Sequence, residues 1–67
     1  MRSYSEFQMS LSIDNKTGAA TAYLLGAETD GRWSWLADAE FGPFDTVLDV
    51  TAWLVRKVVA NGGHLLR

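Results

Sequence analysis

The sequence of this 67-residue chain predicts an α+β domain, a three-stranded antiparallel meander followed by one C-terminal helix that packs on one face of the sheet (βββα). Three observations lead to this fold class. Tyr4–Asp14 alternates between apolar and polar residues, which is typical of a half-buried strand. Short turn signals separate it from two further strand-like segments, so that neighbouring strands run antiparallel. The last part of the chain has the apolar spacing and the end signals of a helix.

The first two strands are joined by a turn at Asp14–Gly18, where Asn and Gly accept positive φ. The first strand, Tyr4–Asp14, directs one set of apolar residues to the core, namely Phe7, Met9, Leu11 and Ile13. The second strand, Ala19–Ala27, is ambiguous because both of its faces are apolar. Ala22 and Leu24 compete with Tyr23 and Leu25 for the core. The sequence leaves open which face is buried.

The third strand, Arg32–Phe41, follows the hairpin signal Asp30-Gly31 and ends at Gly42-Pro43. Strict alternation places one set of residues on the core face, namely Trp33, Trp35, Ala37, Ala39 and Phe41. The opposite face of the sheet is then uncovered and largely polar, with Glu6, Gln8, Ser10, Ser12, Ser34 and Asp38, and with Leu36 among them.

The helix is predicted over Thr46–Ala60, and both of its ends are marked in the sequence. Thr46 can be the N-cap, and Asp49 occupies the acidic position of a capping box. Asn61-Gly62-Gly63 is a stop signal, because Gly readily takes the left-handed conformation that ends many helices. A short tail, His64–Arg67, follows.

At about 100° per residue, one broad face of this helix is apolar, with Val47, Leu48, Leu54, Val55, Val58 and Val59. Asp49, Arg56, Lys57 and Ala60 fall on the other side. Trp53 falls there too, flanked by Val50. Two interpretations of an exposed Trp53 remain open: a cation–π contact with the Lys57 stem on the helix surface, or a contact with a second chain.

We therefore expect a single domain over residues 1–67 with one small core. The expected core residues are Phe7, Met9, Leu11, Ile13, Trp33, Trp35, Phe41, Val47, Leu54, Val55 and Val58. The chain has no cysteine, which excludes a disulfide or a thiolate metal site. It has no apolar run long enough to cross a membrane and no signal peptide, so we expect a cytoplasmic protein without a membrane partner.

The sequence contains no arrangement of residues that is typical of a catalytic site. The single histidine, His64, has no predicted acid or base beside it. Asp38, Glu40, Asp45 and Asp49 gather around the start of the helix, but helix starts attract acidic residues through the helix dipole alone. We expect capping and a solvated rim there rather than a metal site. The prediction is a non-enzyme without cofactor or metal.

The order strand, strand, strand, helix, with Gly42, Phe44, Asp45 and Thr46 leading into the helix, resembles several families of small domains. The plant ethylene-response-factor type DNA-binding domain has this topology and a similar Gly-x-Phe-Asp-Thr segment. The double-stranded-RNA-binding fold and the HicB-type antitoxins share the strand-strand-strand-helix core. The DNA-binding family reads the major groove with arginines and tryptophans on its open sheet face. That face here carries Glu6, Asp38 and Glu40, so the resemblance implies the fold more than the activity.

Two functional hypotheses follow. The preferred one is a small protein-interaction module, either a homodimer or an inhibitor or adaptor that docks on a larger protein, phage-like or antitoxin-like by analogy. Its predicted contact residues are Trp53, Val50, Lys57, Asp49 and Arg56. The alternative is a dimeric nucleic-acid-binding domain that uses Lys16, Arg32, Arg56 and Lys57. The net charge of -2 makes nucleic acid the less favoured partner.

Overall fold

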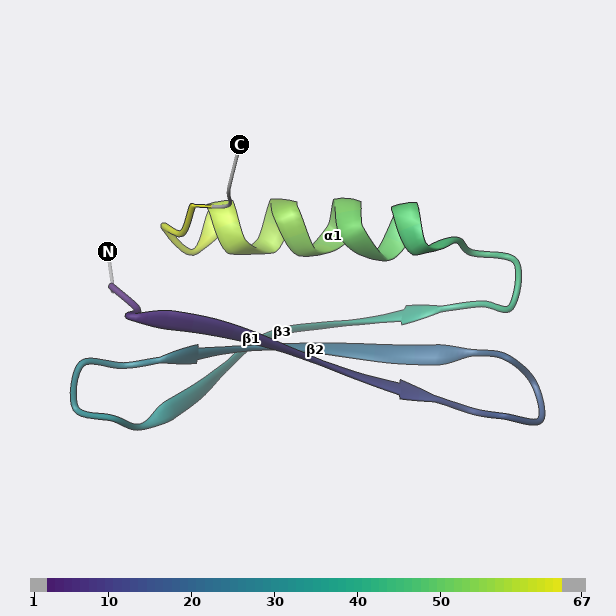
Figure 1. Ribbon diagram of the computed structural model, residues 1–67, viewed down its shortest axis with the longest axis horizontal. Coiled ribbons are helices and arrows are strands. Elements are labelled where there is room, and N and C mark those ends of the chain that lie inside the picture. Colours follow the sequence, from purple (N-terminus) through teal and green to yellow (C-terminus); the bar gives the residue numbers. More distant parts are fainter. Residues whose placement is uncertain (1–2, 65–67) are drawn as a thin grey trace.

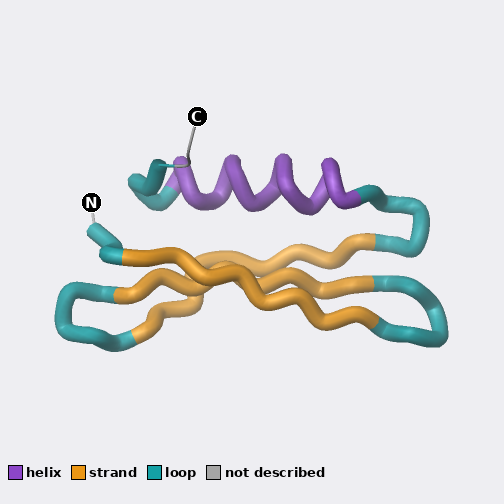
Figure 2. Tube along the Cα trace, in the orientation of Figure 1, coloured by secondary structure: helices purple, strands orange, loops and turns teal. Residues whose placement is uncertain are grey.

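The computed structural model describes residues 3–64 and contains three strands and one helix. The strands are β1 (Glu6–Ile13), β2 (Ala20–Ala27) and β3 (Trp33–Phe41), and the helix is α1 (Val47–Ala60). The strands form one antiparallel sheet in the order β1-β2-β3, and α1 lies across one face of it (Figures 1 and 2). The predicted fold class and element order are confirmed. The last three residues of the predicted tail lie outside the described residues.

The two hairpin turns form as their sequences predict. In the β1–β2 turn, the backbone N–H groups of Lys16 and Thr17 donate to Asp14 Oδ1 at 2.9 and 3.4 Å. In the β2–β3 turn, the backbone N–H of Arg32 donates to Asp30 Oδ1 at 3.0 Å. Both are local contacts in which an aspartate carboxylate accepts from the chain two or three residues on, and they fix the strand connections.

The helix ends also form as predicted. Asp49 N–H donates to Thr46 Oγ1 at 3.3 Å, and Thr46 N–H donates to Asp49 Oδ2 at 2.7 Å, which completes the capping box. At the other end Gly62 has φ of 81°. The N–H groups of Gly62 and Gly63 donate to the carbonyls of Val59 and Val58 at 3.0 and 2.9 Å, a Schellman motif.

The face of α1 that meets the sheet differs from the prediction. Trp53 and Val58 are buried, at 6% and 2% exposure, whereas Val47, Leu48, Val55 and Val59 are exposed. The prediction that Trp53 lies on the wet side of the helix is therefore wrong, and so is the assignment of Val47 and Val55 to the core.

The physical reason for this orientation lies in the sheet. The floor beneath the helix is made largely of alanines, with Ala22, Ala37 and Ala39 in or against the core cluster. Such a floor leaves space that a valine cannot fill and an indole can. The Trp53 ring meets the Phe41 ring edge to face, with centroids 6.1 Å apart and an interplanar angle of 81°.

A bulge in β3 changes which of its side chains face the helix. Leu24 pairs with Ala37 but Leu25 pairs with Trp35, so Leu36 is an extra residue on β3. The extra residue shifts the alternation by one, and Trp35 points away from α1 while Leu36 and Ala37 pack against the core. The prediction that Trp33 and Trp35 are core residues is therefore wrong. They are 45% and 63% exposed.

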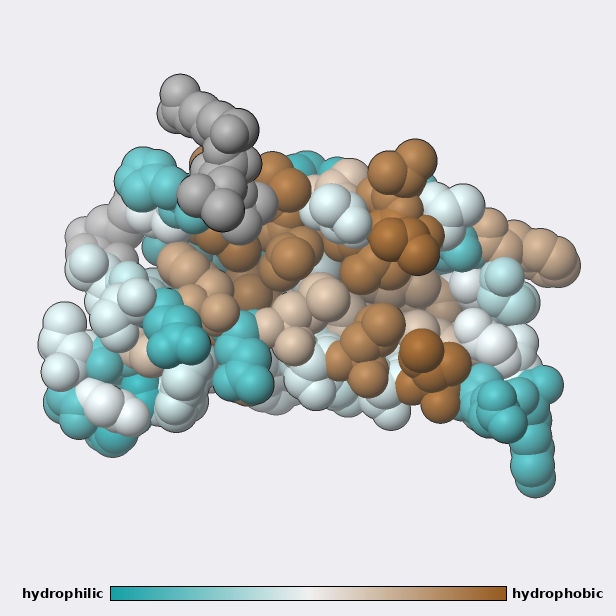
Figure 3. All heavy atoms as spheres, viewed as in Figure 1, coloured by the Kyte–Doolittle hydropathy of each residue, from teal (hydrophilic) through white to brown (hydrophobic). Residues whose placement is uncertain are grey.

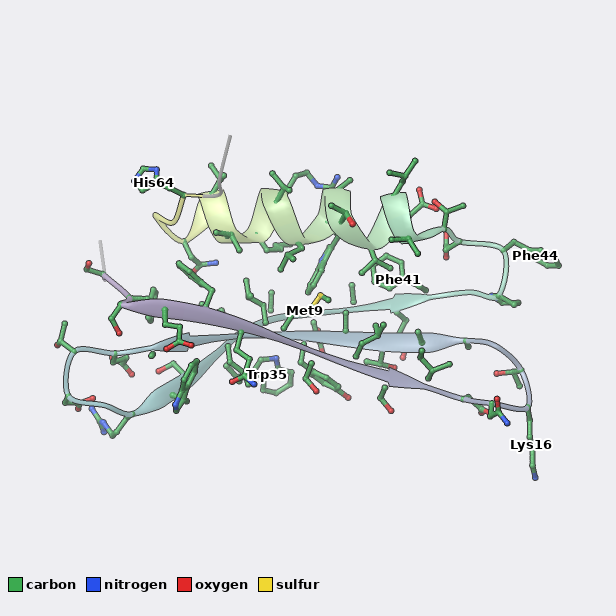
Figure 4. All side chains as sticks on the ribbon, in the orientation of Figure 1. Met9, Lys16, Trp35, Phe41, Phe44 and His64 are labelled. Atoms are coloured by element: carbon green, nitrogen blue, oxygen red, sulfur yellow. The ribbon has the colours of Figure 1, made fainter. Side chains whose placement is uncertain are left out.

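The structure also shows which sides of β2 and β1 face the helix. On β2, Ala22 and Leu24 are fully buried beneath α1, which places Tyr23 and Leu25 on the open side of the sheet. On β1, Phe7 and Met9 pack against the core as predicted. Figure 4 shows Met9 and Phe41 between the sheet and the helix, and Trp35 on the opposite side of the sheet.

Two further residues of the predicted core, Leu11 and Ile13, are 41% and 63% exposed. They share the side of β1 on which Phe7 and Met9 lie, but the end of the helix is over the start of β1. There Gly63 approaches Phe7 so closely that an added Cβ would lie 2.5 Å from its ring. Within residues 3–64, nothing covers the far half of β1.

Candidate functional site

The predicted partner-binding residues do not form an exposed cluster. Trp53 is buried against the sheet and cannot anchor a partner, because its side chain already fills the core. Val50 and Lys57 are half-buried beside it. Asp49 is exposed but occupied in the capping box, and Arg56 alone is exposed without a structural role in the helix cap. The interaction surface expected around Trp53 is therefore corrected.

The basic residues of the nucleic-acid alternative are spread over the molecule. Lys16 lies in the β1–β2 turn and projects from one end of the sheet (Figure 4). Arg32 lies in the turn at the opposite end, where its Nε donates to Asp30 Oδ2 at 2.6 Å. Arg56 and Lys57 lie on α1. The fold does not bring these four residues together into one basic patch.

The acidic residues near the helix start have structural roles. Asp45 Oδ2 accepts the backbone N–H of Gly42 at 2.7 Å, and Asp49 accepts that of Thr46. Within residues 3–64, no group of three His, Cys, Asp or Glu side chains is placed to hold a metal ion. Over the same residues, no helix has the length and apolar character that a membrane crossing requires.

An apolar surface covers the outside of the helix and the uncovered half of β1. We call it the outer apolar surface, and its members are Leu11, Ile13, Phe44, Val47, Leu48, Val55 and Val59. Phe44, Val47 and Leu48 are the most exposed, at 96%, 81% and 78%. Figure 3 shows the apolar atoms on one side of the molecule, over α1 and over the far part of β1, and Figure 4 shows Phe44 projecting from the corner before the helix.

This surface exists because α1 is apolar on two sides. Trp53, Leu54 and Val58 face the sheet, while Leu48, Val55 and Val59 recur at helical spacing on the outward side. A helix that is apolar on both sides is typical of an element buried between two layers. Among residues 3–64 only one of those layers is present.

A second surface is the side of the sheet that faces away from α1, which we call the open face. The strand register places its residues in rows that cross the three strands. From one end to the other, the rows are Glu6, Ala27 and Trp33, then Gln8, Leu25 and Trp35, then Ser10, Tyr23 and Asp38, then Ser12, Thr21 and Glu40. The aromatic residues therefore occupy the first three rows, all on β2 or β3, and acidic residues lie around them.

The centre of the open face is a shallow hollow of about 370 Å³ lined by Ser10, Tyr23, Leu25 and Trp35. The Tyr23 and Trp35 rings meet edge to face, with centroids 6.0 Å apart and an interplanar angle of 61°. Trp35 Nε1–H donates to the carbonyl of Ala37 at 3.0 Å. Because both contacts are internal, the Trp35 ring is held in place although most of it is exposed.

The sequence predicts that one sheet face is uncovered and largely polar, but it places Trp33 and Trp35 in the core rather than on that open face. The outer apolar surface is not predicted, because Leu11, Ile13, Val47 and Val55 are expected in the core. One signal was present for the open face. Trp35-Leu36-Ala37 is a run of apolar residues in a strand that otherwise alternates, and such a run is typical of a bulge, where the alternation of side chains between the two faces shifts by one residue.

No family model, curated protein or solved structure matches this chain. The outer apolar surface and the open face are therefore the features of the molecule that point to a function.

Proposed function

We propose that this chain is a non-enzymatic protein-interaction module that forms a homodimer through its outer apolar surface. The observation that carries the proposal is the exposure of the outward side of α1, where Leu48 and Val59 are 78% and 59% exposed. Contiguous apolar surface of this kind marks an interaction site in soluble proteins. A domain of this size also buries a small core, so association adds to its stability.

The area of the surface fits a second copy of the chain. With roughly 100 Å² for a fully exposed aliphatic side chain and roughly 200 Å² for phenylalanine, the exposed fractions amount to roughly 550 Å² of apolar area. A standard interface buries about 800 Å² on each partner, of which about 60% is apolar. The two values agree, so one such surface supplies the apolar part of one side of a stable dimer.

Two-fold symmetry determines which residues meet across this interface. In a symmetric pair each surface meets its own copy, so the residue nearest the axis contacts itself. The outward stripe of α1 runs from Leu48 to Val59, and Val55 lies near its middle. Val55 of one chain is then placed beside Val55 of the other.

The test is the mass of the chain in solution, measured by analytical ultracentrifugation over a range of concentrations, for the parent and for Val55→Lys. The substitution removes an aliphatic contact twice per dimer, about 1 kcal/mol each, and places two like charges together. We expect the dimer to weaken by at least about thirtyfold. The monomer should keep its fold, because the lysine stem can lie along the helix with its charge in water.

Ala60→Lys is the matched control, since it adds the same charge to an exposed helix position outside the outer apolar surface. Its dimer should be as stable as that of the parent. A parent chain that stays monomeric up to millimolar concentration refutes the proposal. Equal weakening by Val55→Lys and Ala60→Lys refutes the assignment of the interface to this surface.

A further inference from the structure

The open face has the features of a prepared aromatic binding surface. Trp35 is 63% exposed, yet its indole N–H donates a hydrogen bond to the carbonyl of Ala37 and its ring contacts the Tyr23 ring. A tryptophan of this kind has few conformations left to lose when a ligand covers it, which favours binding. The hollow beside it offers Leu25 as an apolar wall and Ser10 as a polar one.

The charge around this hollow has one sign. Glu6, Asp38 and Glu40 lie on the open face and are exposed. Asp38 is directly opposite Tyr23 in the register, in the row next to that of Trp35. None of the positions that the described strands direct to this face is a lysine or an arginine. Over the described strands the face therefore combines π surfaces with carboxylates and carries no cation.

We propose that the open face binds a cationic segment of a partner protein, with an arginine or lysine side chain lying over the Trp35 ring and its charge beside Asp38. A cation is attracted to the face of an indole ring, and a neighbouring carboxylate strengthens that attraction. Nucleic-acid bases can also stack on aromatic rings, but their phosphates would meet Glu6, Asp38 and Glu40. A neutral sugar can stack as well, but it does not use the negative charge of the face.

This site is independent of the proposed dimer, because the outer apolar surface lies on the other side of the sheet (Figure 4). A negative result for binding of a cationic segment can therefore be distinguished from a negative result for dimer formation. The probe is a heptapeptide of alternating serine and arginine with blocked ends. The control probe is the same peptide with citrulline, a neutral analogue of similar shape, in place of arginine.

The measurement is a titration of the full chain followed by two-dimensional ¹H–¹⁵N NMR. We expect the arginine peptide to shift the Trp35 indole signal and the backbone signals around Tyr23 and Asp38. The indole signal of Trp53, buried on the other side of the sheet, is an internal control and should not move. The citrulline peptide should bind at least about threefold more weakly, since it lacks the charge that a cation–π contact requires.

Variants test the two parts of the site separately. Trp35→Ala should weaken binding of the arginine peptide by about three- to thirtyfold. Asp38→Asn should weaken it by about two- to fivefold. Ala60→Lys changes the net charge by the same amount as Asp38→Asn but lies on the helix, and it should leave the affinity unchanged within about twofold. Far-ultraviolet circular dichroism checks that each variant is folded.

Three results overturn the inference. The first is equal affinity for the arginine and citrulline peptides. The second is an absence of shifts at Trp35 up to several millimolar peptide. The third is binding of oligothymidylate or of cellohexaose at Trp35 in the absence of arginine-peptide binding, which assigns the face to another ligand class. If Trp35→Ala is unfolded, Asp38→Asn carries the test, because Asp38 is exposed and outside the core.

Discussion

Replacement of Trp53 by alanine should remove most of the stability of this domain. Only 6% of this residue is exposed to solvent. Burial of an indole withdraws about 200 Å² of surface from water, which is about 5 kcal/mol at 25 cal/mol per Å². Measured substitutions of buried tryptophan or phenylalanine by alanine cost about 3–5 kcal/mol. A domain of this length has a total stability of roughly 3–10 kcal/mol.

The assay is urea unfolding followed by far-ultraviolet circular dichroism, with all proteins at one concentration because association adds to apparent stability. Trp35→Ala is the matched control. It removes the same side chain from a position that is 63% exposed, and it should cost only about 1–2 kcal/mol. If Trp53→Ala and Trp35→Ala shift the midpoint equally, the orientation of α1 described above is wrong. The same conclusion follows if Trp53→Ala unfolds at the midpoint of the parent.

Three smaller effects on the free energy of unfolding can be measured by the same method. Thr46→Ala removes the side-chain acceptor for the Asp49 N–H and should cost about 1 kcal/mol. Gly62→Ala should cost about 1 kcal/mol, because Gly62 has φ of 81° in the Schellman motif. Gly63→Ala should cost more, since its Cβ would lie 2.5 Å from the Phe7 ring and 2.6 Å from Val58, whereas Gly42→Ala has 3.8 Å of clearance and should be close to neutral. A neutral result for Gly63→Ala would place the helix end away from β1.

The elements and their ends could be predicted from the sequence because local chemistry determines them. The capping box of Thr46 and Asp49 needs only two side chains and the backbone between them. The turns at Asp14 and Asp30 likewise depend on contacts two or three residues apart. Such signals are readable before any tertiary structure exists.

The orientation of the helix could not be predicted, because two apolar sides of α1 compete and the choice is made by the sheet. Leu48, Val55 and Val59 form as good an apolar stripe as Leu54 and Val58 with Trp53. What decides is the volume above Ala22, Ala37 and Ala39, which depends on how β2 and β3 pair. That pairing includes the bulge at Leu36, which a prediction from strict alternation does not take into account.

The residues of the two candidate surfaces are those affected by the helix orientation and by the bulge in β3. Every residue that was wrongly assigned to the core, from Trp35 on the sheet to Val47 on the helix, is a large apolar side chain that the structure exposes. The sequence therefore identified the residues with an apolar role but could not say whether the apolar neighbour belongs to this chain or to another. In a small domain both cases give the same pattern.

If the chain pairs through its outer apolar surface, the geometry of the dimer limits how the open faces can act. The outer apolar surface and the open face lie on opposite sides of the sheet, so the two open faces of a dimer point away from each other. A short cationic segment cannot reach both, because avidity requires a linker that spans the two sites. Isothermal titration of the arginine peptide should therefore give one site per chain without cooperativity. Val55→Lys should leave both the stoichiometry and the affinity unchanged. A change in either would show that the open face is completed by the second chain.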